Sequence, residues 1–305
     1  MKNIFVVLLF GFSFSLCAQN TSELEFASAV SQSNLQTMVR DLVKFAPRMG
    51  GTVRGDQSAE YLAQQFRDAG LQTEIVEDPE LLSFEHDRWS LAVEEPSALR
   101  EYIQNEWLAG YSPSVKLQRA NLLSAELSQE NAYGGSIVLT EKRISSELYN
   151  AYVKAGAVCI LTYAPATQGK YTDAAFISSL RSVSDNPIPV FNLSYKNGAG
   201  LKSELQKGTP IVLSFMTETT IARRKPKTVV ATLKGESDQY YIVCAHGDSD
   251  SGGPGADDNA SGTAGVVEVA RALQKLISTK SISPPKKTIK FIVWGSEIYS
   301  TGHFV

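Results

Sequence analysis

The order of the predicted elements in the last third of the chain indicates an α/β protein. An apolar run over 240–245 is typical of a strand buried on both faces, and a loop rich in Gly and Asp follows it over 247–259. An amphipathic helix comes next, and a second strand covers 288–294. The apolar face of the helix carries Val266, Val269, Ala270, Leu273 and Ile277. This order of elements predicts a core whose loops gather at the strand ends, where such folds place their functional sites.

The composition is that of a globular protein. The chain has 305 residues, enough for one large domain or two ordinary ones, and its 43% hydrophobic and 20% charged residues argue against disorder or a coiled coil. The formal net charge of −3 argues against a nucleic-acid partner, which would need a basic surface. Three cysteines are too few for a disulfide scaffold, and three histidines limit any metal site built on imidazole.

The N-terminus has the anatomy of an export signal. Lys2 precedes an apolar stretch over 4–16, and small residues follow at positions 17 and 18. The stretch is too short to span a bilayer, so we interpret residues 1–18 as the cleaved signal peptide of a secreted or periplasmic protein without a later transmembrane segment. Cys17 could carry a lipid anchor, although Leu16 before it does not favour one. A buried N-terminal strand or helix is the other interpretation.

Helices and strands follow one another through the middle of the chain. A first helix should begin near residue 35 and stop before Pro47, and a second should follow a turn at 54–56 and end at Gly70. Residues 80–130 give no clear pattern. Strands are predicted over 72–76, 136–140, 157–162, 190–193, 211–215 and 227–233, and helices over 145–155 and 198–206.

Two further features concern the core and the domain organisation. Cys159 and Cys244 both lie in apolar runs, so we expect them to be small core residues, and a disulfide between them stays open. The basic, polar segment 223–227 is typical of a connector on the surface. We therefore expect a domain boundary beside it.

Polar residues follow both strands of the last third. His246 and Asp248 come directly after the strand over 240–245, and Glu297 comes after the strand over 288–294. A neutral imidazole together with carboxylates suits Zn²⁺, and Asp248 could orient the ring by a hydrogen bond. A lone histidine is more often structural. Glu297 could be a general base whose pKa is raised by burial, or a glutamate favoured at a helix N-terminus.

An acidic pair lies where the amphipathic helix begins. Asp257 and Asp258 come shortly before Ser261. A carboxylate at position 258 could bridge two cations. Asp and Asn are also preferred helix-capping residues, so the spacing alone supports metal binding and capping about equally.

These segments together resemble metallopeptidase family 28, the co-catalytic di-zinc exopeptidases that include secreted bacterial aminopeptidases and relatives of plasma glutamate carboxypeptidase. The combination of His-Gly-Asp-Ser at 246–249 with Gly-Ala-Asp-Asp-Asn-Ala-Ser-Gly at 255–262 is fairly specific, whereas either piece alone is not. A stretch at 135–216 is similar to the protease-associated domain often inserted in such enzymes. The other similar segments are 46–70, 242–249, 266–273 and 287–297.

The resemblance implies a three-layer α/β/α zinc-exopeptidase core with a mixed sheet, and an inserted protease-associated-like α+β domain. It divides the chain after the signal peptide into the first part of the peptidase domain at 19–84, the inserted domain at 85–222 and the rest of the peptidase domain at 223–305. It also implies a secreted zinc-dependent exopeptidase, most simply an aminopeptidase, that acts on peptide substrates.

The resemblance assigns a role to each candidate residue. It makes His246 a terminal ligand of one zinc ion, Asp248 the residue that orients this histidine, and Asp258 the carboxylate between two zinc ions. Glu297 matches the general base that takes a proton from the attacking water. The expected cofactor is therefore Zn²⁺, with two ions in a complete site and fewer where ligands are missing.

The sequence departs from the family pattern after Glu297. The family has two adjacent glutamates there, a base and a zinc ligand. If Glu297 is aligned with the base, the ligand position holds Ile298, whose aliphatic side chain cannot bind zinc. If the alignment is shifted by one residue, Glu297 is the ligand and Ser296 replaces the base. The family's remaining Asp and distant His would lie beyond Val305, and His303 is too close to Glu297 to be that His. We therefore expect a C-terminally incomplete or degenerate copy with an unpaired sheet edge and exposed apolar surface.

Two other functions compete with the peptidase. A truncated or degenerate homologue would hydrolyse nothing and would act at most as a binding protein. A serine hydrolase could use Ser249 as its nucleophile. However, the sequence has no Gly-x-Ser-x-Gly motif, and Ser300 stands where a late Asp-x-x-His pattern needs Asp, so the serine hydrolase is the weakest of the three.

Overall fold

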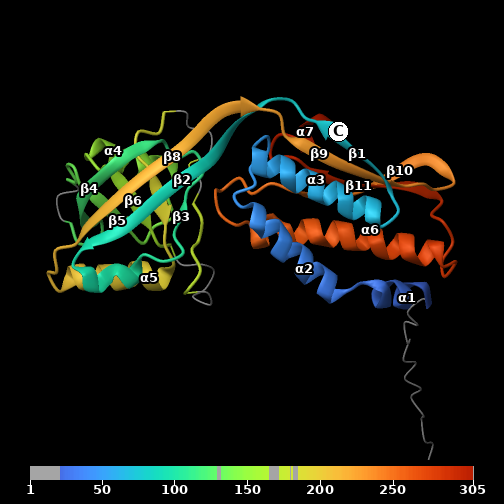
Figure 1. The fold of residues 1–305 in the computed structure, drawn as a ribbon, viewed down its shortest axis with the longest axis horizontal. Coiled ribbons are helices and arrows are strands. Elements are labelled where there is room, and N and C mark those ends of the chain that lie inside the picture. Colours follow the sequence, from blue (N-terminus) through green and yellow to red (C-terminus); the bar gives the residue numbers. More distant parts are fainter. Residues whose placement is uncertain (1–20, 129–131, 165–171, 179, 181–184, 305) are drawn as a thin grey trace, which may run out of the picture.

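The computed structural model describes residues 21–128, 132–164, 172–178, 180 and 185–304, so the predicted signal segment lies outside the described part. The described strands form two sheets, one of four strands and one of seven. Figure 1 shows these sheets side by side along the long axis of the molecule, each with helices beside it. The predicted mixed α/β fold is confirmed.

The four-stranded sheet carries the candidate site. In order across the sheet its strands are β1 (Gln72–Glu77), β9 (Lys227–Leu233), β11 (Lys287–Trp294) and β10 (Ser237–His246). β9 pairs antiparallel with both β1 and β11, and β10 runs parallel to β11, so the sheet is mixed. His246 lies beside Trp294 in the parallel pair, and the two strands therefore end at the same edge.

Helices cover one face of this sheet (Figure 1). They are α2 (Gln32–Leu42), α3 (Val53–Asp68) and α6 (Gly262–Ser278), with α1 (Thr21–Ala29) lying against α6. Their buried side chains, such as Phe66 and Val267, pack in one cluster with Phe291 of the sheet. The opposite face carries a smaller buried cluster that includes Ile292 and Trp294.

The beginning of α3 differs from the prediction. The sequence indicated a turn at 54–56, whereas the helix begins at Val53 and includes these residues. The Thr52 hydroxyl accepts a hydrogen bond from Gly55 N–H at 3.0 Å, which caps the helix one turn earlier. The predicted end is correct, because Gly70 follows the helix with a φ of 86°, a left-handed conformation that favours glycine.

The seven-stranded sheet contains the strands predicted in the middle of the chain. In chain order its strands are β2 (Leu81–Glu95), β3 (Trp107–Leu108), β4 (Val115–Ser124), β5 (Ile137–Thr140), β6 (Cys159–Thr162), β7 (Val190–Asn192) and β8 (Val212–Arg224). Their order across the sheet is β2-β8-β4-β5-β6-β7-β3. The two predicted helices are α4 (Ser146–Lys154) and α5 (Tyr195–Gln206). The short helical segments of the described residues are 43–45, 97–102, 256–261 and 301–304.

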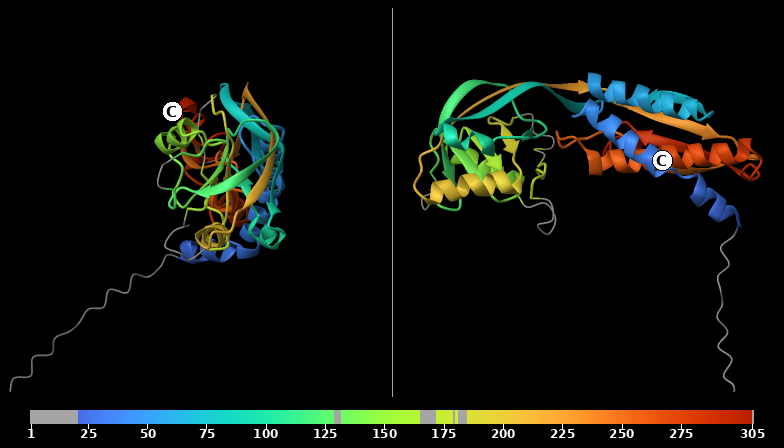
Figure 2. Two further views of the ribbon diagram at one scale, coloured as in Figure 1. Left: turned by 90° about the vertical axis from the view of Figure 1, so that its left-hand side faces the viewer. Right: turned by 60° about the horizontal axis from the view of Figure 1, so that its bottom comes forward.

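Two long strands, β2 and β8, connect the sheets (Figures 1 and 2). Leu81 pairs with Arg224 close to the first sheet, and the antiparallel pairing continues to Glu95 and Val212 within the second. Only residues 78–80 separate β1 from β2, and only 225–226 separate β8 from β9. The expected domain boundaries at 84/85 and 222/223 fall inside these two strands.

The region over 80–130 gave no clear sequence pattern, yet it contains β2, β3 and β4. In β2, register shifts between His86 and Arg88 and between Val93 and Glu95 interrupt the alternation of inward and outward side chains. A period of two residues is the main sequence signal for a strand, and a bulge removes it.

The prediction that the strand over 240–245 is buried on both faces is wrong. β10 lies at an edge of the four-stranded sheet, where Tyr240, Tyr241 and Ile242 are 50%, 60% and 40% exposed. Of the described strands, only β11 pairs with it. Among the described strands, the outer edge of β10 is unpaired and carries exposed apolar side chains. The sequence had placed this strand inside the sheet.

Cys159 and Cys244 differ in their surroundings. Cys159 is buried in β6, as predicted, but Cys244 is exposed because it lies on the edge strand β10, so its assignment to the core is wrong. Both cysteines are free thiols, and the disulfide left open by the sequence is not formed.

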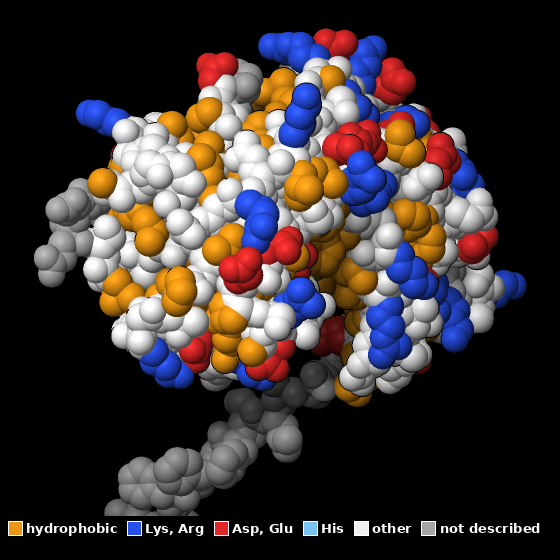
Figure 3. All heavy atoms as spheres, turned by 60° about the vertical axis from the view of Figure 1, so that its left-hand side comes forward, with side chains coloured by type: hydrophobic (Ala, Val, Ile, Leu, Met, Phe, Trp, Pro, Cys, Tyr) orange, Lys and Arg blue, Asp and Glu red, His pale blue; other side chains and the backbone are white. Residues whose placement is uncertain are grey.

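The surface carries charges of both signs. On the face in Figure 3, Lys and Arg side chains are interspersed with Asp and Glu, without a large patch of one sign. Among the helices of the described residues, none has the length and apolar character needed to cross a membrane.

Candidate active site

His246 is the last residue of β10, and both nitrogens of its ring face carboxylates. Nδ1 lies 3.0 Å from Asp248 Oδ1, and Nε2 lies 3.0 Å from Asp258 Oδ1. The side chains of Asp248, His246 and Asp258 are 1%, 14% and 66% exposed, respectively. The ring is thus held between a buried carboxylate on one side and an exposed carboxylate on the other.

The surrounding charges change the protonation of this ring. Burial lowers the pKa of His246, but the hydrogen bond with Asp248 and the negative charges of Asp248, Glu297 and Asp258 outweigh it, and the pKa is raised. Complete burial raises the pKa of the Asp248 carboxyl group, which the hydrogen bond with His246 opposes. The site therefore favours a positive charge at or beside the ring.

Glu297 joins the site from the end of β11. Its backbone N–H donates to Asp248 Oδ1 at 3.1 Å, and Gly247 N–H donates to Trp294 O at 2.8 Å, so the ends of the two parallel strands are tied together. In the described structure, the buried atoms Glu297 Oε2 and Asp248 Oδ2 have no hydrogen-bond partner. A buried carboxylate oxygen in this state can accept a proton or a donor from a ligand.

Helix capping does not account for the acidic pair. The hydrogen bond at the start of α6 involves Asn259, whose Oδ1 accepts from Gly262 N–H at 3.0 Å. Residues 256–261 form an irregular turn before the helix, and no capping bond from the side chain of Asp257 or Asp258 is present in this part of the structure. The carboxylate of Asp258 faces His246 instead.

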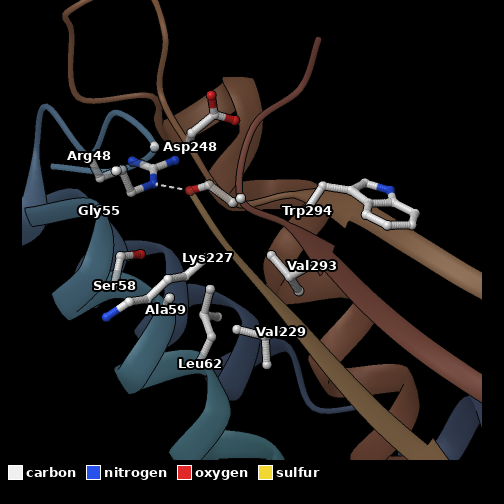
Figure 4. Close-up of a pocket in the computed structure, with 14 residues that line it drawn as sticks. Arg48, Gly55, Ser58, Ala59, Leu62, Lys227, Val229, Asp248, Val293 and Trp294 are labelled. Carbon is white, nitrogen blue, oxygen red and sulfur yellow. Dashed lines mark hydrogen bonds between the residues drawn. The ribbon is translucent and has the colours of Figure 1, made fainter. Parts of the chain in front are cut away.

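Arg48 holds the loop that carries these residues, a role that the sequence did not reveal. Its side chain is fully buried and donates three hydrogen bonds to backbone oxygens: Nε to Gly247 at 2.8 Å, Nη1 to Pro254 at 2.7 Å and Nη2 to Gly255 at 2.8 Å. Its backbone N–H also donates to Ser249 Oγ at 3.0 Å. Figure 4 shows the side chain reaching the backbone beyond β10 from the chain segment before α3. One planar group therefore fixes both ends of the loop.

The serine hydrolase finds no support in this geometry. Ser249 is 3% exposed, and its hydroxyl accepts the backbone N–H of Arg48. The nearby His246 bonds to Asp248 through Nδ1 and faces Asp258 through Nε2. The side chain of His303 lies outside the described part of the structure.

The residues next to Glu297 do not add a ligand. Ile298 is 51% exposed and has no atom that can bind a metal. Ser296 is 2% exposed, and its N–H donates to Ser300 Oγ at 2.8 Å, while Ser300 itself donates to Asp78 at 2.6 Å. These contacts fix the backbone around Glu297 rather than extending the site.

The ligand atoms at His246 are of the type that zinc binds, and they face each other. An imidazole nitrogen and a carboxylate oxygen 3.0 Å apart can both reach one ion at the usual distance of about 2 Å. A carboxylate on the other ring nitrogen, here Asp248, is the usual partner of a zinc-binding histidine. The described residues contain no group of three or more His, Cys, Asp or Glu placed to hold a metal, whereas a catalytic zinc site commonly has three protein ligands.

Solved structures with a similar fold include two peptidases. A peptidase M28 precursor from Shewanella amazonensis SB2B matches with a TM-score of 0.68 and 16% identity, over 93% of this chain and 69% of that one. BSAP, a zinc aminopeptidase from Bacillus subtilis, matches with a TM-score of 0.55 and 20% identity, over 89% of this chain and 64% of that one. At these identities the likeness concerns the fold alone.

The sequence comparisons find a similar family and two similar proteins. Residues 228–299, which contain all four candidate residues, match the model of Peptidase family M28. Aminopeptidase YwaD of Bacillus subtilis (strain 168) is 31% identical over 124 residues, which are 39% of this chain and 24% of that protein. Leucine aminopeptidase 2 of Trichophyton equinum is 26% identical over 171 residues, 53% of this chain and 33% of that protein. The chain thus spans about a quarter to a third of the length of these relatives.

Proposed function

We propose that this chain forms the zinc-binding core of a secreted exopeptidase, most simply an aminopeptidase that removes the terminal residue of a peptide. The observation that carries the proposal is the ring of His246 between Asp248 and Asp258, in a segment that matches Peptidase family M28. The relatives named above are aminopeptidases, and one is a zinc enzyme. The signal-like segment 1–18 supports secretion.

Each residue has a part in this proposal. His246 would bind zinc through Nε2 and Asp258 through its carboxylate, which would lie between two ions in a complete site. Bound zinc would polarise the scissile carbonyl and make water more acidic. Asp248 holds the ring through Nδ1, so that Nε2 stays directed at Asp258. Glu297, with its buried and unpartnered Oε2, accepts the proton of the attacking water and passes it to the leaving amine.

Zinc content tests the ligands. Asp258→Asn should lower zinc affinity about tenfold or more, because it weakens one of the two described ligands, and His246→Ala should do so by removing the other. The matched control is Asp257→Asn, a neighbouring carboxylate that does not face the ring. Bound zinc is measured by mass spectrometry of the metal after equilibrium dialysis. Equal zinc content in the Asp258→Asn and Asp257→Asn variants would overturn the assignment.

Turnover tests the base. Glu297→Gln should leave zinc content unchanged and reduce hydrolysis of a leucine anilide by about 10²- to 10⁴-fold, because the amide cannot take the proton. The control is Glu236→Gln at an exposed position away from the site. An active Glu297→Gln variant would rule out the role of Glu297.

A second candidate function is a catalytically inactive homologue that binds peptides. The observation in its favour is the exposed Ile298 beside Glu297, together with only two zinc ligands among the described residues. It predicts zinc binding that depends on His246 but no hydrolysis of peptides or anilides by the purified chain. Measurable turnover that disappears in the Glu297→Gln variant would exclude this alternative.

A further inference from the structure

A cavity opens beside the loop that carries the candidate zinc ligands. Its volume is about 270 Å³, close to the lower limit of about 300 Å³ for small-molecule sites. One wall is formed by the first turn of α4 and by Arg143 and Ile144, which precede it. A second wall is formed by Ile177, Leu180 and Asn186. Ser251 lines the side toward the loop. The cavity therefore lies between the seven-stranded sheet and the site loop.

The loop that follows His246 connects the candidate zinc ligands with the cavity. Ser251 follows Asp248 by three residues, so their Cα atoms are at most about 11 Å apart, the length of about three extended residues. The loop is fixed against the other sheet, because Gly110 N–H donates to Ser251 O at 2.9 Å. The loop backbone also packs closely against the cavity wall at Gly253. A Cβ atom added to this glycine would lie only 2.6 Å from Ile177 Cγ1. In Figure 1 this loop, which precedes α6, extends toward the second sheet.

Arg143 gives the cavity a positive charge. Its guanidinium group stacks over the ring of Phe176, 4.6 Å from the ring centre, and forms no ion pair with another residue in the described ranges. Glu147, in the first turn of α4, is occupied with its own helix, since hydrogen bonds from its own backbone N–H and from Ser145 lower its pKa. Arg143 is thus the charged group available to an anionic ligand, and its planar fork suits a carboxylate.

Asn186 offers a fixed acceptor in the same cavity. The residue is 6% exposed, and its Nδ2 donates to Tyr111 O at 3.0 Å, which sets the orientation of the amide. Its Oδ1 has no hydrogen-bond partner in the described structure. A buried acceptor without a partner is costly unless a ligand supplies a donor, such as a peptide N–H.

The remaining wall is apolar and rigid. Ile144 and Leu180 are each 7% exposed. The hydroxyl of Tyr149 donates to Ile188 O at 2.9 Å and accepts from Ile188 N–H at 3.1 Å, so its ring is held in place. Such a wall accommodates an aliphatic side chain between the two polar groups.

We propose that this cavity binds the carboxyl-terminal residue of a short peptide. The free carboxylate lies on Arg143, the backbone N–H donates to Asn186 Oδ1, and an aliphatic side chain packs on Ile144 and Leu180. The inference rests on the proposed exopeptidase function in one respect, namely that the amino end of the same peptide lies at His246.

Peptide binding to the zinc-free protein tests the cavity independently of catalysis. The probes are the tripeptide Leu-Gly-Leu with a free carboxylate and the same peptide with a C-terminal amide, titrated by calorimetry in the presence of a chelator. The free acid should bind about tenfold more tightly than the amide, because only the acid forms charge-assisted hydrogen bonds with Arg143. Arg143→Gln should abolish this difference. Arg143 is exposed, so the melting temperature of the variant should stay near that of the wild type.

Two control variants show whether the preference for the acid belongs to Arg143 and to this cavity. Lys142→Gln removes a neighbouring exposed charge outside the cavity and should keep the preference. His246→Ala should keep it too, so a failure of the zinc assignment leaves the cavity assignment standing. Equal binding of acid and amide by the wild type, no binding of either, or loss of the preference in the Lys142→Gln variant would overturn the proposal.

Discussion

Arg48 illustrates how one residue far from the site in sequence determines its geometry. It lies about 200 positions before the loop that it binds, and all three of its side-chain bonds go to backbone oxygens. Burial lowers the pKa of Arg48 to about 10, against the opposing charges of Asp248 and Asp258, so the group stays charged at neutral pH. The carboxylates of Asp248 and Asp258 therefore stabilise the charged form of Arg48, which in turn holds their loop.

Replacement of this arginine tests its role. Arg48→Lys should destabilise the protein by about 3–5 kcal/mol, because one ammonium group cannot reach three carbonyl oxygens and leaves buried acceptors without a donor. Urea unfolding gives the change in free energy, and zinc affinity should fall with it. Arg54→Lys is the control, since Arg54 donates one bond, to Ala46 O at 2.7 Å, and should cost about 1 kcal/mol. Equal losses in the two variants would show that Arg48 has no special role.

At this scale the sequence predicts the site better than its support. His246, Asp248 and Asp258 lie within 13 residues, and the family resemblance of this short segment singled them out as candidates. The bonds of Arg48 are made to carbonyl groups, which every residue has, so no side-chain pattern marks them. The Pro-Arg dipeptide in the family-like segment was the one signal that could have pointed to it.

At the scale of elements, Glu268 joins α6 to the N-terminal helices. It is 1% exposed and accepts hydrogen bonds from Ser31 N–H at 2.6 Å and Arg271 Nε at 2.7 Å. Burial raises its pKa, but the bonds from Arg271, Ser31 and Asn34 outweigh burial and leave the pKa lowered. Because the folded state binds the proton less readily, Glu268 stabilises the protein above its unfolded pKa, and this contribution is lost as the pH falls through the folded value.

A pH series should reveal this contribution. Glu268→Gln should lower the free energy of unfolding by about 1–2 kcal/mol at pH 7, because the charge-assisted bonds are weakened. The difference from the wild type should shrink once the pH falls below about 4.5, where the unfolded carboxyl group is protonated. Denaturant unfolding at several pH values measures it, with Glu236→Gln at an exposed position as the control. A difference that stays constant from pH 7 to pH 3 would contradict the assignment.

Periodicity explains which elements the sequence could predict. The predicted strands over 136–140, 157–162 and 190–193 and the helices over 145–155 and 198–206 are all present, because their apolar residues recur with the period of the element. β2 was missed because bulges interrupt its alternation. The exposure of β10 was missed because an apolar run looks the same at the centre and at the edge of a sheet.

At the scale of the whole molecule, the described strands form two sheets, and the sequence could not predict how these two parts are connected. The connection depends on pairing between β2 and β8, segments more than 100 residues apart, and no local pattern reports such a partner. The same pairing brings the site loop against the second sheet through Ser251 and Gly110. The cavity lined by Arg143 exists only because both parts contribute to its walls.

The paired strands β2 and β8 also affect the order in which the molecule assembles. β1 and β9 must find each other across residues 78–226, a long loop to close. Once Leu81 is paired with Arg224, only residues 78–80 and 225–226 remain between them, which lowers the entropic cost of closure by on the order of 3 kcal/mol. Folding of the seven-stranded sheet therefore brings β1 and β9 of the four-stranded sheet together. A change deep in the seven-stranded sheet can slow the formation of a site that it never contacts.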